Sequence, residues 1–244
     1  MTRQRADLLL VERGYFDSRA RAQAAIAAGL VTAGGAVVRK ASEAIAPDAE
    51  ITAAAAHPWV SRGGVKLAHA LETFAIPVED RIALDVGAST GGFSQVLLER
   101  GAARVYAVDS GHGQLHPALR RAPCLVSLEG VDARRLSRAL VPDAVDLVVI
   151  DVSFISLTLV LQAALNLAAP AADLVALVKP QFEAGREHVG KGGIVREEAV
   201  HHLVCERIVA HVASLGWRVR DVVPSPIAGG DGNREFLLAA DRRP

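Results

Sequence analysis

The chain has 244 residues, 51 % of them hydrophobic, and its 27 basic side chains balance 27 acidic ones, so the formal net charge is zero. This composition excludes a disordered or low-complexity chain and allows one large domain together with a small one. A neutral chain gives no sign of nucleic-acid binding by itself, so the local distribution of charge has to decide.

Signals for membranes, secretion and cross-linking are weak. No apolar run reaches the length of a membrane span, and Asp7 and Glu12 follow the N-terminus too closely for a signal peptide. Cys124 and Cys205 lie far apart without a C-x-x-C spacing, so neither a disulfide framework nor a metal site is expected. We therefore expect a cytoplasmic protein that uses no membrane and no metal.

Residues 3–51 are predicted to form a small α+β unit. Apolar residues at helical spacing predict helices over residues 6–11 and 19–28. A glycine pair between two short apolar runs predicts a β-hairpin over residues 30–40, and residues 50–52 are expected to add a last strand.

The charges of this unit are nearly balanced, and a solvated helix face is the alternative to a binding role for its arginines. The order of motifs favours binding. The start Arg5-x-Asp7, the run Gly14-Tyr15-Phe16-x-Ser18-Arg19 and the following hairpin resemble the RNA-binding domain first described in ribosomal protein S-four. In such domains phosphate and shape contacts dominate. The basic residues that we expect to contact RNA are Arg3, Arg5, Arg19, Arg21, Arg39, Lys40 and Arg62.

An alanine-rich stretch that ends in His-Pro is typical of a linker. We predict an RNA-binding domain over residues 1–55, a linker over residues 56–62 and a second domain over residues 63–244. Lys66 follows a glycine pair near the start of a helix expected over residues 67–74, where a positive charge is mildly unfavourable. This position indicates either a functional role or a tolerated surface lysine.

The stretch over residues 82–93 organises the second domain. A short apolar strand ends in Asp85, a glycine-rich turn follows and a helix begins, which is the opening of a nucleotide-binding βαβ unit. Gly87 and Gly91 can take positive φ and let a ligand come close. Their spacing differs from G-x-G-x-x-G and resembles the turn of methyltransferases that use S-adenosylmethionine. A tight turn that binds nothing is the alternative.

Further strands are predicted over residues 104–108, 125–128, 146–150 and 173–178. We expect an α/β fold, a Rossmann-like sheet that is mostly parallel with an antiparallel edge strand. Ligands of such sheets bind outside the carboxyl ends of the strands, where an acid after the second strand typically binds ribose hydroxyls. The residues that we expect to bind the cofactor are Asp85, Gly87, Ser89, Thr90, Gly91, Gly92, Phe93, Asp109, Asp132 and Asp151.

The C-terminal part of the chain is predicted to complete the sheet. Residues 181–194 combine glycines with basic side chains and favour either a mobile basic lid or a plain flexible loop. Two late strands are expected over residues 217–223 and 234–240. An amphipathic helix is predicted over residues 197–215, and surface positions are expected for its histidines His201, His202 and His211.

Four charged residues are expected to converge beside the methyl donor: Lys66, Asp151, Lys179 and Glu235. A lysine near an alcohol stabilises the alkoxide that forms as a methyl group moves to the oxygen. Neighbouring acids hold the lysine in place and influence its protonation. The group therefore suits a poor nucleophile such as a ribose hydroxyl.

Over its whole length the chain resembles the TlyA family (haemolysin A-like), which joins an S-four-type domain to an FtsJ/RrmJ-like 2′-O-ribose methyltransferase. The motifs that carry the resemblance are Gly91-Gly92-Phe93-Ser94, the run over residues 148–156, Lys179-Pro180-Gln181-Phe182-Glu183, the run over residues 190–196 and Gly232-Asn233-Arg234-Glu235. The resemblance implies a K-D-K-E tetrad at Lys66, Asp151, Lys179 and Glu235. It also implies S-adenosylmethionine as cofactor and methylation of cytidine in ribosomal RNA of one or both subunits.

Two other classes of function stay open. The older family name suggests a membrane-active haemolysin, and the βαβ motif is equally compatible with a ribosome-assembly factor that binds S-adenosylmethionine without catalysis. Convergence of the four charged residues would favour the enzyme over the assembly factor. Neither the target nucleotide nor the oligomeric state follows from the sequence.

Overall fold

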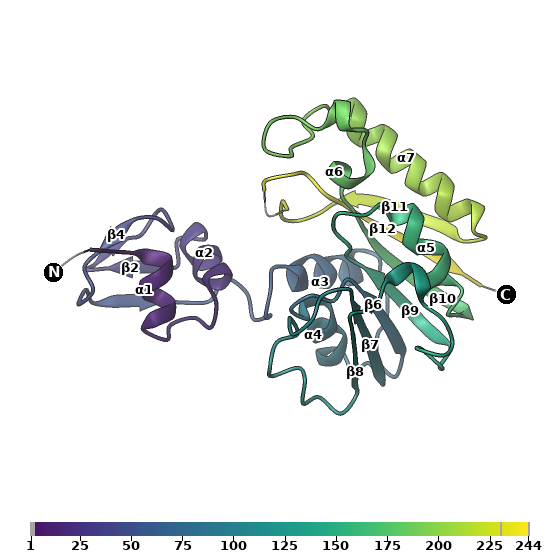
Figure 1. The fold of residues 1–244 in the computed structure, drawn as a ribbon, viewed down its shortest axis with the longest axis horizontal. Coiled ribbons are helices and arrows are strands. Elements are labelled where there is room, and N and C mark those ends of the chain that lie inside the picture. Colours follow the sequence, from purple (N-terminus) through teal and green to yellow (C-terminus); the bar gives the residue numbers. More distant parts are fainter. Residues whose placement is uncertain (1–2, 230, 244) are drawn as a thin grey trace. The chain divides into compact units, whose positions relative to one another are not determined.

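The computed structural model describes residues 3–229 and 231–243 and divides into two compact units, unit 1 over Met1–Arg62 and unit 2 over Gly63–Pro244. The division falls at the first residue of helix α3 (Gly63–Thr73). Figure 1 labels the helices and strands of both units.

Unit 1 is a small α+β unit with its own core. Its elements are β1 (Gln4–Arg5), α1 (Ala6–Glu12), α2 (Arg19–Ala27), β2 (Val31–Ala33), β3 (Ala36–Val37), β4 (Ala44–Ile45) and β5 (Ile51–Ala53). Ser18 caps α2 by accepting a hydrogen bond from the Arg21 N–H. Strands β3, β2 and β5 form an antiparallel sheet. Leu9, Leu10 and Ile26 pack into the core between the helices and this sheet.

Unit 2 is built on a seven-stranded sheet in the order β11-β12-β10-β9-β6-β7-β8. Its strands are β6 (Ile82–Val86), β7 (Arg104–Asp109), β8 (Leu125–Glu129), β9 (Val145–Ile150), β10 (Ala168–Val178), β11 (Arg218–Pro224) and β12 (Phe236–Arg242). Neighbours from β10 to β8 are parallel, whereas β12 is antiparallel to both β10 and β11. The predicted Rossmann-like sheet with an antiparallel edge is therefore confirmed.

Helices cover both faces of this sheet, with α3 and α4 on one side and α5 and α7 on the other (Figure 1). The remaining helices of unit 2 are α4 (Gly92–Glu99), η1 (Ala133–Arg135), α5 (Leu157–Leu165), α6 (Pro180–Glu183), η2 (Arg186–His188) and α7 (Glu198–Ser214). Leu161 of α5 and Ile208 of α7 share a core cluster with Leu84, Val148 and Leu174 of the sheet. Strands buried on both faces explain the near-continuous apolar runs in the sequence.

The surface position expected for His201 is wrong. This side chain is only 5 % exposed, its Nε2 lies 3.1 Å from the Val195 carbonyl oxygen, and its ring meets Phe236 edge-on. His201 shares one helix face with the buried Val204 and Ile208, so helical spacing turns it towards the sheet.

The segment over residues 181–194 has local structure that the sequence did not predict. It contains α6 and η2, and Gly190 forms a β-bridge with Ile194. The buried Asn233 donates to the Gly193 carbonyl and accepts from the Val195 N–H, which fastens the end of the segment to the chain that leads into β12.

Two further properties bear on the expected function classes. Cys124 and Cys205 are free thiols. Among residues 3–229 and 231–243, no helix has the length and apolar character needed to cross a bilayer.

Candidate active site

The turn after β6 brings two strand ends together. Gly87 has φ +88°, and its N–H and that of Ala88 both donate to the Val108 carbonyl, at 2.8 and 3.0 Å. A Cβ atom added to Gly87 would lie 2.4 Å from the Asp151 carbonyl oxygen. Only glycine therefore permits this approach of the turn to the end of β9.

The surroundings of Gly91 differ from those that the sequence suggested. It has φ +93°, as predicted, but an added Cβ would meet Leu119 Cδ1 at 2.3 Å and Leu115 Cδ1 at 2.8 Å. The space that its missing side chain leaves is filled by these two leucines of the loop after β7. The contribution of Gly91 is thus to let this loop pack against the start of α4.

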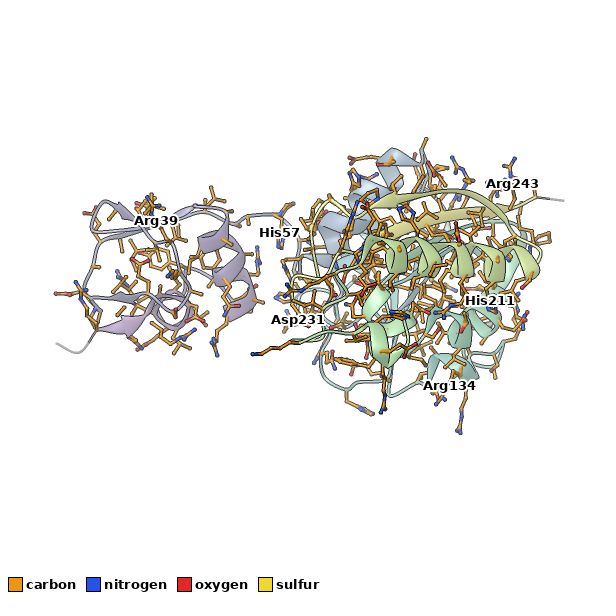
Figure 2. All side chains as sticks on the ribbon, turned by 90° about the horizontal axis from the view of Figure 1, so that it is seen from above. Arg39, His57, Arg134, His211, Asp231 and Arg243 are labelled. Carbon is orange, nitrogen blue, oxygen red and sulfur yellow. The ribbon has the colours of Figure 1, made fainter. Side chains whose placement is uncertain are left out.

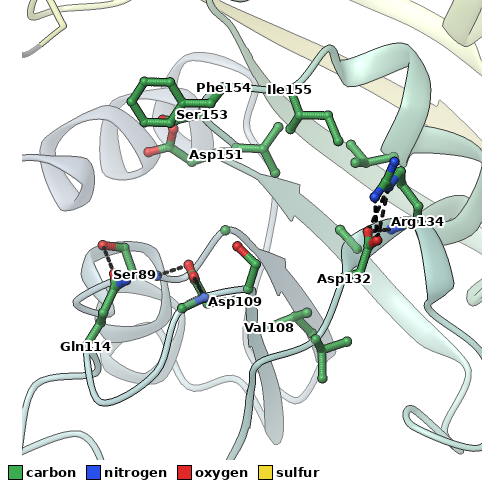
Figure 3. Close-up of a pocket in the computed structure, with 17 residues that line it drawn as sticks. Ser89, Val108, Asp109, Gln114, Asp132, Arg134, Asp151, Ser153, Phe154 and Ile155 are labelled. Atoms are coloured by element: carbon green, nitrogen blue, oxygen red, sulfur yellow. Dashed lines mark hydrogen bonds and ion pairs between the residues drawn. The ribbon is translucent and has the colours of Figure 1, made fainter.

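A cavity of about 680 Å³ opens outside the carboxyl ends of β6, β7 and β9 (Figure 3). Among the residues expected to bind the cofactor, those that line it are Gly87, Ser89, Asp109, Asp132 and Asp151. The others do not line it: Asp85, Thr90, Gly91, Gly92 and Phe93. Phe93 belongs to the buried core, and Asp85 lies fully buried under the turn.

Asp109 is held in a fixed orientation at the cavity. One carboxylate oxygen accepts from the Ser89 N–H at 2.8 Å, and the other accepts from the Gly111 N–H at 2.7 Å. Ser89 Oγ in turn donates to Gln114 Oε1 at 3.1 Å. Figure 3 shows these side chains on one side of the cavity. Each oxygen of Asp109 retains a second lone pair, so the carboxylate can also accept from a pair of ligand hydroxyls.

Asp132 lies on another wall of the cavity, beside Arg134 (Figure 3). Its carboxylate accepts from the Arg134 backbone N–H at 3.0 Å and from the Arg134 guanidinium at 2.7 Å. The side-chain hydrogen bond from Arg134, helped by the backbone bond, lowers the pKa of Asp132 to about 2. Asp132 is therefore a permanent acceptor at neutral pH, and an amino group of a ligand could share it with Arg134.

Asp85 is a buried carboxyl with an unfilled acceptor. Its Oδ2 accepts from Ser94 Oγ at 2.7 Å, while Oδ1 finds no hydrogen-bond partner among the residues that the structure describes. Burial raises the pKa of Asp85 to about 7, the Ser94 hydrogen bond opposes this change, and the charge of Asp151 adds to it. A nearby positive charge would therefore stabilise the ionised form of this carboxyl.

Two lysine–acid pairs lie at the same edge of the sheet. Lys179 Nζ lies 2.6 Å from Asp151 Oδ1, and Lys66 of α3 forms an ion pair with Glu235. Both lysines and Glu235 are buried, and Asp151 is mostly so. These pairs are the four residues that the sequence singled out.

Strand register explains why the two pairs are neighbours. Val178 of β10 is paired with Phe236 of β12, so Lys179 leaves β10 where Glu235 enters β12. Ile150 of β9 is paired with Ala176, so Asp151 lies at the same edge on the other side of β10. Parallel pairing with β9 and antiparallel pairing with β12 thus place Asp151 and Glu235 on either side of Lys179.

Two residues that the sequence did not single out stand at this place. Ser153 Oγ lies 2.8 Å from Lys179 Nζ and lines the cavity. Phe154 has φ +64°, is 91 % exposed, and its ring centroid lies 5.0 Å from that of Phe182. Both follow directly on Asp151, but their contacts depend on distances between strands that a sequence does not reveal.

The arginines expected to bind RNA fall into two groups. Arg5 and Arg19 both donate to the buried Asp7, at 3.0 and 2.9 Å, and the Arg5 hydrogen bond holds the pKa of Asp7 well below its usual range. Arg21 pairs with Asp17 at 3.1 Å. The other basic side chains expected to bind RNA are exposed: Arg3, Arg39, Lys40 and Arg62. Figure 2 shows Arg39 on the surface of unit 1.

Comparisons with known proteins agree with this geometry. The chain matches the FtsJ-like methyltransferase family over residues 59–242. A protein of Mycobacterium tuberculosis named 16S/23S rRNA (cytidine-2'-O)-methyltransferase TlyA is 45 % identical over 238 residues, which cover 97 % of this chain and 89 % of that protein. Hemolysin A of Brachyspira hyodysenteriae is 38 % identical over 234 residues, 96 % and 98 % of the two chains. A solved structure from Streptococcus thermophilus, described as a hemolysin, has 41 % identity and a TM-score of 0.79, with coverage of 100 % of this chain and 90 % of that one.

The raised pKa of Asp85 predicts a pH-dependent contribution to stability. Between the ordinary value of 3.8 and about 7, the folded chain binds a proton at Asp85 that the unfolded chain has lost, so its free energy of unfolding falls as pH rises. Asp85→Asn removes this pH dependence. The change in the free energy of unfolding that it removes is a few kcal/mol at most, because a shift of one pKa unit corresponds to about 1.4 kcal/mol.

The measurement is chemical unfolding of both proteins from pH 4 to pH 8. We expect the wild type to lose stability relative to the asparagine variant up to about pH 7, after which the difference is constant. A difference that is flat between pH 4 and pH 7 contradicts the assignment of a raised pKa.

Proposed function

Because the chain belongs to the FtsJ-like methyltransferase family, and to the TlyA group within it, we propose that it transfers a methyl group from S-adenosylmethionine to the ribose 2′-hydroxyl of cytidine in ribosomal RNA. The family matches confirm the resemblance that the sequence motifs predicted. The observation that carries the proposal is the pair of buried lysine–acid contacts beside the cavity.

The cavity has the donors and acceptors that S-adenosylmethionine needs. Asp109 offers carboxylate oxygens to ribose hydroxyls, and Asp132 offers an acceptor to an adenine amino group. Gly87 has no side chain and so leaves room for the ligand to approach the backbone. Asp85 Oδ1 has no hydrogen-bond partner among the described residues, and the buried Asp85 favours a positively charged group nearby. When bound, this cofactor supplies an electrophilic methyl group on a positively charged sulfur.

The two lysines act on the other reactant. Lys179 places its ammonium group at the cavity wall formed by Asp151 and Ser153, where it stabilises negative charge that develops on the ribose oxygen as the methyl group is transferred and the hydroxyl proton passes to water. Lys66 and Glu235 add a second charge pair at the same edge. Exclusion of water from these side chains strengthens their electrostatic effect.

Ribosomal RNA as substrate is supported by the names of relatives and by features of both units. Phe154 offers an exposed ring on which an RNA base can stack. In unit 1, the exposed side chains of Arg3, Arg39, Lys40 and Arg62 offer contacts to phosphate. Action on ribosomes implies a cytoplasmic location.

The two alternatives have less support. Membrane lysis rests on the names of relatives alone. A non-catalytic assembly factor has no need of two buried lysine–acid pairs, since a buried ion pair often contributes less stability than well-packed hydrophobic side chains of similar volume.

Transfer of a labelled methyl group to ribosomal subunits tests the function. Purified protein is incubated with labelled S-adenosylmethionine and each isolated subunit, and the digested RNA is separated into nucleosides. The proposal requires label in 2′-O-methylcytidine. Label only in base-methylated nucleosides, or none with either subunit, would overturn it.

Substitution of Lys179 tests its proposed role in the reaction. Lys179→Ala is expected to bind both substrates normally and to slow transfer by roughly a hundredfold or more, because a key electrostatic group is lost. Lys179→Arg is not expected to restore the rate, since a planar guanidinium is broader than an ammonium and presents its donors in a different geometry. Single-turnover transfer at saturating concentrations measures both. Recovery by the arginine variant would mean that Lys179 serves only to pair with Asp151.

Gly87 provides a test of the cavity. Gly87→Ala places a Cβ against the Asp151 carbonyl and is expected to weaken S-adenosylmethionine binding at least tenfold, as measured by calorimetry. Gly216→Ala is the matched control, because Gly216 also has positive φ, has open space at its Cβ position and does not line the cavity. Equal affinity in the two variants would remove the cavity as the cofactor site.

Unit 1 has its own core, so its removal tests whether it binds RNA while unit 2 binds the cofactor. The fragment over residues 63–244 is expected to fold and to bind S-adenosylmethionine, yet to lose methylation of ribosomal subunits through weaker RNA affinity. In the intact protein this affinity should fall steeply with salt. Full activity of the fragment on subunits would contradict the proposed RNA-binding role of unit 1.

A further inference from the structure

We propose that Ser153 is a positioning residue for Lys179: its hydroxyl fixes the ammonium group in the direction from which it meets the ribose oxygen. This inference rests on the proposed function. It starts from the 2.8 Å contact between Lys179 Nζ and Ser153 Oγ, on a serine that also lines the cavity.

The donor count of the ammonium group supports the role. Lysine carries three N–H donors and no acceptor. The ammonium group forms an ion pair with Asp151 Oδ1 at 2.6 Å, but that oxygen has no hydrogen-bond partner among the described residues. The hydrogen bond to Ser153 Oγ, which accepts, is therefore the directed contact of Lys179, and its other N–H groups can meet a further acceptor such as a ribose hydroxyl.

A directed hydrogen bond orients the ammonium group in a way that an ion pair does not. The ion pair with Asp151 holds Nζ in place, whereas the hydrogen bond to Ser153 Oγ fixes the rotation of the ammonium group about the Cε–Nζ bond. Ser153 and Asp151 both follow β9, two residues apart, and both line the cavity. The directions of the remaining N–H groups are thereby defined before a substrate binds.

A purely structural role for this hydroxyl is a poor explanation. Ser153 is exposed at the cavity, and Lys179 is the side chain with which it forms a hydrogen bond. Lys179 keeps its ion pair with Asp151 when the hydroxyl is removed. Ser153→Ala therefore affects the orientation of Lys179 far more than it affects the packing of the core.

The experiment compares single-turnover methyl transfer to ribosomal subunits by full-length variants at saturating S-adenosylmethionine and RNA. Ser153→Ala is expected to slow transfer about tenfold while the affinities for both substrates and the unfolding midpoint stay unchanged. Ser153→Thr keeps the hydroxyl and is expected to remain within about twofold of the wild-type rate. Ser127→Ala, at an exposed position on β8, is the control.

A double variant shows whether Ser153 acts through Lys179. Adding Ser153→Ala to Lys179→Ala is expected to cause no further loss of rate, because the group that Ser153 positions is already absent. Additive losses would overturn the proposal, as would a normal rate for Ser153→Ala, a threonine variant as slow as the alanine variant, or a loss confined to RNA affinity. These outcomes leave methylation by the wild-type protein intact, whereas failure of the proposed function appears as absence of 2′-O-methylcytidine with the wild type itself.

Discussion

The antiparallel pairing of β12 with β10 is the constraint on which the proposed active site depends. Val178 opposite Phe236 places Lys179 and Glu235 at one end of the two strands, beside the parallel strand that delivers Asp151. A shift of this register by one residue would turn every side chain of β12 to the other face of the sheet. The long ladder between β10 and β12, whose apolar side chains are buried, opposes such a shift and so fixes the geometry of the charged residues.

Burial makes these charges both costly and useful. Removal of one member of a buried ion pair leaves an uncompensated charge, which typically costs about 3–5 kcal/mol. Lys66 and Glu235 form one such pair, and Lys179 and Asp151 form the other. The glycine at position 87 makes a different contribution, because it lets the turn after β6 lie against the backbone of Asp151 and so brings the cavity next to that residue.

The sequence predicted the features that local pattern controls. Apolar runs that end in an acid identified the parallel strands and the edge where Asp85, Asp109 and Asp151 gather, because strand ends of a parallel sheet share one edge. The glycine-rich turn was likewise recognisable, since positive φ at Gly87 and Gly91 follows from residue type.

Features that depend on distances between distant segments escaped prediction. The two-residue strands β1 and β4 are too short to show alternation. His201 was expected at the surface because no acid or cysteine spacing indicated a ligand role, whereas Val195 and Phe236 provide its partners from elsewhere in the chain. The space beside Gly91 was expected to serve a ligand, but Leu115 and Leu119 occupy it. Ser153 lay within a motif of the resemblance but was given no role of its own, since its contact with Lys179 joins residues of two different strand ends.

The central claim is that the lysine–acid pairs at this edge methylate ribose in ribosomal RNA. The most direct measurement maps 2′-O-methylation by mass spectrometry on ribosomal RNA from cells that lack the protein, cells that carry the wild type and cells that carry Lys66→Ala. The account predicts a cytidine whose ribose methylation is present only with the wild-type protein. Identical methylation maps in all three, or a methyl group restored by the Lys66→Ala variant, would contradict it.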